Sequence, residues 1–415
     1  VAVVGTGVSG VVCAYLLSRR HEVSVFEAED RPGGHTRTVS VASPEGDLAL
    51  DTGFIVYNER TYPGLTRLFG ELGVPTQPSD MSFSVSDEPS GLEWQASRPG
   101  TVFAQRRNLL RPAFLRMLGD VARFNRYGRR LLGSGPAGDR TLGELLAEGR
   151  WSRQFSDWYL VPLGSSIWSA DPRGFDQIPL STLVGFFDRH GLLSVGDKPR
   201  WRAVSGGARR YVDAALSGVR ASGRLHLGQR VEQVLRVREG VEVRIEGGAG
   251  HRFDQVVVAT HSDQALELLA DASAEEKEVL GAIRYRTNQA VLHTDASLMP
   301  ACRRAWASWN YRRPVDPAGG PTVTYHLNRL QGLGVAAQYF VSLNQLDAVD
   351  PSAVVETFSF DHPVIDAGAV AAQARWAEVS GRRGVWFCGA YWGFGFHEDG
   401  LQSALRVCRA LGVAW

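Results

Sequence analysis

The feature that most constrains the fold is a strand, turn and helix at the start of the sequence. Residues 1–4 form a short β-branched apolar run, and the glycine-rich turn G-T-G-V-S-G follows it at once. The next residues, V-V-C-A-Y-L-L, have the apolar spacing of a helix. Each glycine has a mechanical reason: Gly5 permits the turn, Gly7 lets a pyrophosphate approach the backbone, and Gly10 lets the helix pack closely on the strand.

A second strand with an acidic end supports the same interpretation. His21–Phe26 is predicted as a strand, and Glu27 ends it at the spacing where a carboxylate accepts the hydroxyls of a ribose. An acidic residue at this position argues against a 2′-phosphate. Strand, turn, helix, strand and carboxylate therefore predict a dinucleotide-binding domain, for NAD or FAD.

The residues after Glu27 favour FAD over NAD. They read A-E-D-R-P-G-G-H-T-R-T, in which Gly33 and Gly34 bring a second set of backbone amides to the phosphates and Arg31 supplies positive charge. NAD-binding domains do not need this addition. The stretch resembles the R-x-G-G-R segment of the superfamily of flavin-containing amine oxidases, protoporphyrinogen oxidases and phytoene desaturases, with His35 in place of the usual second arginine.

Four later segments resemble the same superfamily in the same order. They are L-D-T-G-F at 50–54, V-S-G-G-A-R-R followed by Q-R-V-E-Q-V, the strand Q-V-V-V-A-T-H ending at His261, and the closing stretch from Val385 to Ala404. In the closing stretch a turn near Asp399 and Gly400 would direct a helix N-terminus at the flavin pyrimidine. The predicted FAD-binding residues are Gly5, Gly7, Ser9, Gly10, Glu27, Ala28, Arg31, Gly33, Gly34, His35, Thr36, Gly53, Phe54, Val231, Ala259, Thr260, Gly389, Asp399, Gly400 and Leu401.

These segments imply an α/β fold in which a glutathione-reductase-like FAD-binding Rossmann domain carries a discontinuous α+β substrate domain, as in the amine oxidases. Residues 1–75, 200–262 and 375–415 are predicted to form the FAD-binding domain, and 76–199 and 263–374 the substrate domain. Within the substrate domain we expect helices at Arg111–Leu132 and Thr141–Glu148, a sheet with Asn288–His293 and Val335–Leu343, and surface loops at Gly133–Gly138 and Arg313–Gly320.

One lysine expected from the amine oxidases is missing. The amine oxidases usually carry it in the first long strand of the substrate domain, where it holds a water beside flavin N5. In this sequence Asn288 or Gln289 occupies its place, and Lys277 lies in an acidic helix start that is typical of a solvated surface. We therefore predict Asn288 in the active site and expect reduced flavin to react slowly with oxygen.

The closing stretch supplies the other catalytic candidates. Tyr391 and Trp392 are predicted to form the wall of a substrate cavity, whereas the neighbouring phenylalanines are expected to be packing residues. His397 and Glu398 are candidate acid–base groups, with Glu398 facing solvent or substrate, although consecutive residues cannot all reach one substrate atom. Asp399 is predicted to organise the flavin loop.

The amino-acid composition argues against some classes of binding partner. The 45 basic residues nearly balance 44 acidic ones, so the chain lacks the charge that nucleic-acid binding requires. Four separated cysteines form no metal motif and favour a reduced, cytoplasmic setting. We expect no metal and no transmembrane segment. Contact with a membrane surface or a carrier protein, and the oligomeric state, stay open.

The full chain also resembles one bacterial branch of the superfamily, whose members are predicted NAD/FAD-binding oxidoreductases. Relatives occur fused in front of plant cyclopropane fatty acid synthases. This resemblance implies an FAD-dependent dehydrogenase or desaturase that transfers hydride to flavin N5 from a hydrophobic small molecule, such as a fatty acyl or polyketide-like chain. Two alternatives remain: a redox-neutral double-bond isomerase, and a flavin-binding partner protein without catalysis.

Overall fold

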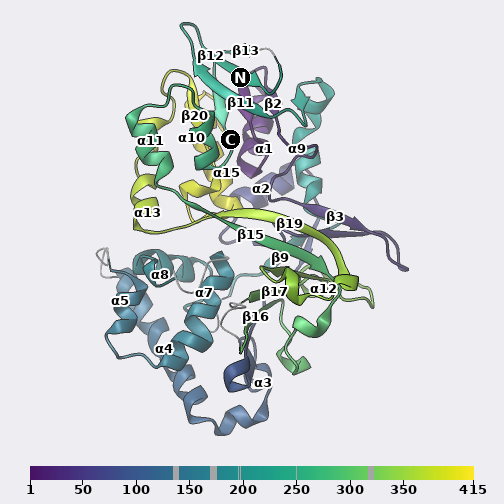
Figure 1. Ribbon diagram of the computed structural model, residues 1–415, viewed down its shortest axis with the longest axis vertical. Coiled ribbons are helices and arrows are strands. Elements are labelled where there is room, and N and C mark those ends of the chain that lie inside the picture. The colour runs from purple at the N-terminus through teal and green to yellow at the C-terminus, as the bar shows by residue number, and fades with distance from the viewer. Residues whose placement is uncertain (134–139, 169–174, 195, 197, 249, 316–321) are drawn as a thin grey trace.

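The computed structural model describes residues 1–133, 140–168, 175–194, 196, 198–248, 250–315 and 322–415. The molecule is elongated, with both chain termini in its upper half and the helices α3 to α8 in its lower half (Figure 1). The helices are α1 (Val8–Leu17), α2 (Pro63–Glu71), α3 (Pro99–Val102), α4 (Pro112–Gly133), α5 (Leu142–Ala147), α6 (Arg153–Phe155), α7 (Val161–Trp168), α8 (Leu180–Arg189), α9 (Arg209–Ala221), α10 (Ser262–Leu268), α11 (Ala274–Gly281), α12 (Leu327–Leu330), α13 (Ala367–Gln373), α14 (Trp376–Val379) and α15 (His397–Ala410).

A five-stranded parallel sheet forms the centre of the upper half. Its order is β10 (Leu225–His226), β2 (Ser24–Phe26), β1 (Ala2–Val4), β14 (Val256–Val258) and β20 (Val385–Phe387). Short β-branched runs suit these positions because both faces of a parallel sheet are covered. Helices α9 and α15 both pack on α1. The second strand is shorter than predicted, since it begins at Ser24 and not at His21.

Segments far apart in the sequence thus assemble one sheet. Smaller sheets adjoin it: β11 (Val231–Arg236), β12 (Val241–Ile245) and β13 (Gly250–Phe253) in one, β3 (Thr38–Val41) and β4 (Leu48–Asp51) in another, and β5 (Tyr57–Asn58), β9 (Trp201–Val204) and β6 (Thr76–Pro78) in a third. The boundaries of the two domains stay a prediction.

A seven-stranded mixed sheet links the upper and lower halves. Its order is β19 (Val354–Pro363), β15 (Tyr285–His293), β18 (Phe340–Leu343), β17 (Thr322–His326), β16 (Trp309–Arg313), β7 (Phe83–Asp87) and β8 (Leu92–Gln95). Strands β15 and β19 run as long antiparallel neighbours across the middle of the molecule (Figure 1). The prediction of a strand over Val335–Leu343 is wrong in its first half, because β18 begins only at Phe340.

The helices below the sheet surround a second core. Its buried side chains are largely aromatic and include Trp94, Phe114, Phe124, Phe155 and Phe187. The predicted helices in this region are present as α4 and α5, and Thr141 caps α5 by accepting a hydrogen bond from the Glu144 amide. The predicted loops at Gly133–Gly138 and Arg313–Gly320 fall mostly on residues outside the described ranges.

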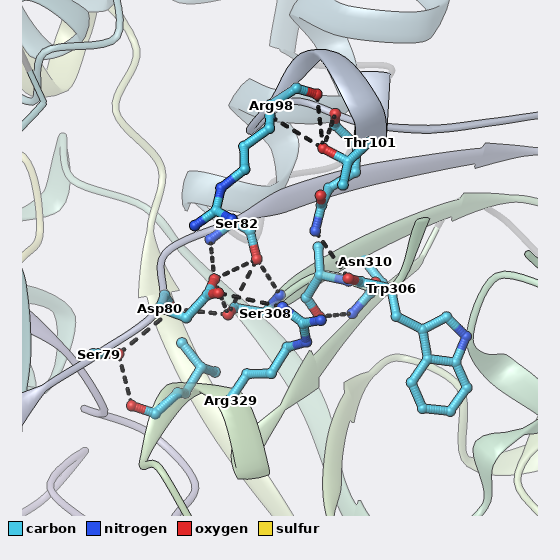
Figure 2. Close-up of polar contacts among 12 residues, drawn as sticks. Ser79, Asp80, Ser82, Arg98, Thr101, Trp306, Ser308, Asn310 and Arg329 are labelled. Carbon is cyan, nitrogen blue, oxygen red and sulfur yellow. Dashed lines mark hydrogen bonds and ion pairs between the residues drawn. The ribbon is translucent and has the colours of Figure 1, made fainter. Parts of the chain in front are cut away.

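A cluster of polar side chains fastens β7 to β16 at the edge of this core (Figure 2). The amide of Ser308 donates to Ser82 Oγ at 3.0 Å, and Ser308 Oγ donates to Asp80 Oδ1 at 2.9 Å. Arg329 reaches the other carboxylate oxygen of Asp80 at 3.2 Å. Because these contacts join segments more than 200 residues apart, they fix the register of the parallel strand pair.

No helix in the described ranges is long and apolar enough to cross a membrane.

Candidate flavin site

The glycine-rich turn has the geometry of an open anion site. A Cβ added to Gly10 would lie 1.9 Å from the carbonyl oxygen of Gly5, so close packing of helix on strand requires a glycine there. A Cβ added to Gly7 would meet nothing within 4 Å, so this backbone borders open space. No side chain caps the N-terminus of α1, which begins at Val8. The turn therefore offers backbone amides to a phosphate.

Glu27 and Arg31 flank this turn. The Glu27 carboxylate accepts hydrogen bonds from the amide and hydroxyl of Thr6, which places it beside the glycines. Arg31 donates to the Gly34 carbonyl at 3.2 Å, while its buried Nε has no partner in the structure. A buried guanidinium nitrogen without a partner is costly and suits a site that takes an anionic group.

The closing helix meets the same turn. Ser9 Oγ donates to the Gly400 carbonyl at 2.9 Å, and a Cβ on Gly400 would lie 2.6 Å from Val8 Cγ1. Leu401 is fully buried in the core that includes α1. The other predicted contacts are distributed as follows: Ala28 is exposed beyond β2, Val231 starts β11, Ala259 and Thr260 follow β14, and Gly389 follows β20.

Asp51 of the D-x-G element links two other segments of the predicted FAD-binding half by hydrogen bonds, a role that the sequence did not reveal. Both carboxylate oxygens of Asp51 accept a hydrogen bond from the Ala208 amide, at 2.9 and 3.0 Å, and Thr38 Oγ1 donates to Oδ1 at 2.6 Å. Burial raises the pKa of Asp51 to about 7. Two residues on, a Cβ on Gly53 would lie 2.1 Å from the carbonyl oxygen of His35. The glycine therefore allows this strand to pass against the R-P-G-G turn.

Four histidines gather where the flavin segments meet the substrate sheet. The ring of His35 lies 5.8 Å from that of His261 and 5.4 Å from that of His362. Phe360 lies 5.0 Å from His35 on another side. His397 lies close by, with Nε2 3.0 Å from Thr36 Oγ1. The R-P-G-G turn, the A-T step, the closing helix and strand β19 each contribute one imidazole.

Desolvation keeps these imidazoles neutral at pH 7. Burial lowers the pKa of His362 to about 4 and that of His397 to about 3. Burial, followed by repulsion from the neighbouring histidines, lowers the pKa of His35 well below its ordinary value. The pKa of His261 is also lowered by burial, and its Nδ1 has no hydrogen-bond partner. Each neutral imidazole keeps a lone pair that can take a proton, although desolvation makes the protonated form less stable than in an ordinary histidine.

Asn288 holds one of these histidines. Its Nδ2 lies 2.9 Å from His362 Nδ1, and its Oδ1 accepts a hydrogen bond from Asn344 Nδ2 at 2.8 Å. Because an amide nitrogen only donates, His362 Nδ1 is the acceptor and its ring proton sits on Nε2. The neighbouring Gln289 side chain is exposed. Asn288 therefore orients an imidazole, a role that differs from the predicted one of holding a water or substrate group directly.

The aromatic residues of the closing stretch pack in two different places. Tyr391 and Trp392 are buried in the core beside β20, although the Tyr391 hydroxyl and Trp392 Nε1 have no partner. Phe394 and Phe396 are half-buried and pack against Phe186 of α8, with ring centroids 5.7 and 5.1 Å away. That Tyr391 and Trp392 form the wall of a substrate cavity stays a prediction, and their core position beside Tyr285 is where the two halves of the molecule meet.

Glu398 and Asp399, although adjacent in the sequence, contact different parts of the structure. Glu398 Oε1 and Oε2 accept hydrogen bonds from the Gly64 and Leu65 amides, each at 3.0 Å, so the carboxylate caps α2. This corrects the prediction that Glu398 faces solvent or substrate. Asp399 accepts from the Phe396 amide at 2.9 Å, and burial raises the pKa of Asp399 to about 6. Its contact with Phe396 agrees with the predicted organisation of the closing loop.

The residues present fit a dinucleotide with a flavin. The open backbone at Gly7 and the unpartnered nitrogen of Arg31 suit the phosphates, and Glu27 suits a ribose. His261 and His362 were missed by the sequence interpretation. The A-T-H step was the only available signal for His261, and His362 lies in a strand without a motif.

Comparison with known proteins agrees with this geometry. The profile of the family described as "Flavin containing amine oxidoreductase" matches residues 8–293. A protein of Mycobacterium tuberculosis named as the flavin-containing monoamine oxidase AofH is 29% identical over 263 residues, which are 60% of this chain and 54% of that protein. The chain thus spans about half the length of the curated relatives that it matches.

Solved structures share the whole fold. Cyclohexylamine oxidase from Brevibacterium oxydans IH-35A superposes with a TM-score of 0.70 at 16% identity, covering 99% of both chains. The CLA-producing fatty acid isomerase from P. acnes superposes with a TM-score of 0.71 at 13% identity, covering 99% of this chain and 98% of the other. At such identities the likeness establishes the fold alone.

Fold and site together define a flavoprotein in which a Rossmann-type parallel sheet is joined to a seven-stranded mixed sheet. The chain belongs to the flavin containing amine oxidoreductase family, and its cofactor is FAD.

Proposed function

We propose that this chain is a dehydrogenase or desaturase of a hydrophobic substrate, such as a fatty acyl or polyketide-like chain. The observation that carries the proposal is the group of neutral imidazoles between the flavin segments and strand β19. Bound FAD supplies an acceptor for a hydride at N5. Removal of hydrogen from two neighbouring carbons then balances when a protein base takes the second hydrogen as a proton.

His35 is the proposed proton acceptor. It lies between His261, His362 and Phe360, and its lowered pKa leaves a free lone pair at neutral pH. His362 is the proposed partner, because its Nδ1 is engaged by Asn288 and its Nε2 carries the proton. Phe360 gives the same position an apolar side, which suits a hydrocarbon chain.

Strand β15 supports a substrate other than an amine. Residues 285–293 contain no lysine, and the only lysines in the chain are Lys198 and Lys277. Lys277 is exposed on α11 and Lys198 is exposed as well. Without an ammonium at the strand position used by the amine oxidases, we expect the reduced flavin to reoxidise slowly in air. Stopped-flow mixing with oxygenated buffer measures this rate, and a fast reaction contradicts the assignment.

Anaerobic mixing with acyl substrates tests the proposed reaction. A dehydrogenase bleaches the flavin absorbance stoichiometrically and forms a product with one more double bond. An isomerase instead turns over with oxidised flavin at steady state and leaves the number of double bonds unchanged. No response to a panel of saturated and unsaturated acyl chains, with intact FAD content, contradicts both and favours a non-catalytic flavoprotein.

Replacement of Asn288 tests the role of the histidines. Asn288→Asp replaces the amide donor by an acceptor, so His362 Nδ1 must take the proton and the tautomer changes. We expect normal FAD content, slower flavin reduction and an altered ¹⁵N signal of one histidine. Asn328→Ala is a matched control, because the Asn328 side chain bonds only backbone atoms of Ala337 and Tyr339. Unchanged reduction kinetics in Asn288→Asp would remove the histidine pair from the mechanism.

A further inference from the structure

A group of leucines lies bare at the lower end of the molecule. Leu110 is 88% exposed, Leu109 51% and Leu115 45%. They lie in a short 3₁₀ helix, Arg106–Leu110, and in the first turn of α4. Helix α3, just before them in the chain, lies at the end opposite to both termini (Figure 1). We call residues 98–116 the leucine–arginine tip.

This exposure is local. The described residues contain only seven large hydrophobic side chains that are strongly exposed, and three of them fall within residues 109–115. Single exposed leucines are common, but adjacent bare leucines on one turn raise the free energy of the protein in water. A surface of this kind is typical of a site that contacts an apolar phase or partner.

The leucine–arginine tip also carries charges of one sign only. Residues 98–116 contain arginines and no acidic residue, although the whole chain has a formal net charge of only +1. In the described part of the chain, no ion pair joins any of these arginines to a carboxylate. The five are Arg98, Arg106, Arg107, Arg111 and Arg116.

Two of these arginines are fixed without losing their charge. Arg107 donates to the Gly91 carbonyl at 2.5 Å and Arg111 to the Ser90 carbonyl at 2.7 Å. Carbonyl oxygens orient a guanidinium but leave its positive charge uncompensated. A further short 3₁₀ helix, Arg303–Ala305, packs on α3 and adds two exposed arginines.

A membrane surface fits this combination better than a protein partner does. Leucines surrounded by arginines can enter the acyl region while the guanidinium groups bind phosphates of anionic headgroups. A stable protein interface needs about 800 Å² from each partner, with mixed polar groups at its rim. Three leucines on two short neighbouring turns, with a rim of positive charge only, do not provide this.

We propose that the leucine–arginine tip docks this protein on an anionic phospholipid surface, with Leu109 and Leu110 among the acyl chains and the four exposed arginines, all but Arg111, at the headgroup phosphates. Such docking would bring the substrate half of the molecule to a source of acyl chains. The proposal does not depend on the proposed reaction, because docking is measured without turnover.

Vesicle flotation of the FAD-loaded protein tests the docking. We expect the wild type to float with vesicles of phosphatidylglycerol and phosphatidylcholine, to stay behind with phosphatidylcholine alone, and to be released by high salt. Leu109→Ser with Leu110→Ser should weaken binding about tenfold or more. Arg106→Glu with Arg116→Glu should abolish it.

Matched controls lie at other surfaces. Arg238→Glu with Arg252→Glu makes the same change in net charge at another surface, because Arg238 is exposed in the turn between β11 and β12 and Arg252 is exposed on β13. Leu346→Ser removes a leucine that is 40% exposed elsewhere. Both controls should float like the wild type. Wild-type protein that ignores anionic vesicles, or tip variants that float normally, would overturn the proposal. Tip-dependent binding to an acyl carrier protein in place of vesicles would also overturn it.

Discussion

Gly7→Ala should weaken FAD binding and leave folding stability nearly unchanged, whereas Gly10→Ala should lower folding stability. Gly7 has φ −59° and ψ 176°, which any residue adopts, and a Cβ there meets nothing within 4 Å of the protein. Gly10 would place its Cβ 1.9 Å from a backbone oxygen that cannot rotate away. The structure therefore predicts that Gly7 is reserved for the ligand and Gly10 for packing.

The magnitudes follow from these contacts. For Gly7→Ala the unfolded chain loses entropy worth about 0.4–1 kcal/mol, and a poorer N-cap offsets a similar amount, so stability changes by less than about 1 kcal/mol. Each lost amide contact with a phosphate costs about 1.5–3 kcal/mol, which weakens FAD binding about 10- to 100-fold. For Gly10→Ala, overpacking against the backbone costs about 3 kcal/mol or more.

Two measurements on each variant separate the effects. Thermal unfolding of flavin-free protein, followed by circular dichroism, reports packing, and the FAD released by heat reports cofactor retention. We expect Gly7→Ala to unfold like the wild type but to lose FAD on dialysis, with a larger loss for Gly7→Leu. Gly10→Ala should already unfold at lower temperature without FAD. Full FAD retention in Gly7→Leu, or equal destabilisation by the two alanines, would refute the assignment of the turn.

Three further predictions concern the titratable groups. Burial lowers the pKa of His35, the proposed base, well below 6.5 and that of its partner His362 to about 4. The rate of anaerobic flavin reduction should therefore show no midpoint near 6.5, and such a midpoint in stopped-flow data would contradict a desolvated base. The same lowered pKa means that the contribution of His362 to folding stability is complete above the unfolded pKa of about 6.5 and is lost as pH falls toward 4. Glu398→Ala should lower the free energy of unfolding by about 1 kcal/mol, because the cap of α2 is lost, and should leave the rate of flavin reduction unchanged. The control is Glu267→Ala at an exposed position. Slower reduction with normal stability would restore Glu398 as a catalytic group.

The sequence was most informative where backbone geometry dictates residue type. The turn at Gly5 to Gly10 could be placed from its glycines alone, because Gly5 and Gly10 meet steric demands of the fold and Gly7 keeps the backbone open for a ligand. The family segments also led to His35 and Asn288. These positions depend on chain-local patterns, which a single sequence displays.

The roles of Glu398, His362 and Tyr391 could not be predicted from the sequence, because they depend on contacts between distant segments. Glu398 looks like an acid–base group beside His397, but its oxygens cap a helix more than 300 residues earlier. His362 has no motif, and its importance comes from Asn288 across the β15–β19 pair. The core in which Tyr391 packs likewise depends on tertiary contacts that no local pattern displays.

The substitutions at the site support one electrostatic argument about the substrate. Where the superfamily resemblance leads one to expect an arginine and a lysine, this chain has His35 and Asn288, and neither carries a charge at pH 7. A permanent cation beside a hydrocarbon chain would have to be desolvated without a counterion, which is costly. A neutral imidazole pays no such penalty in the resting state and still accepts a proton when one is released. We therefore expect a substrate that arrives uncharged, and under the proposed reaction His35 takes the proton that the substrate releases.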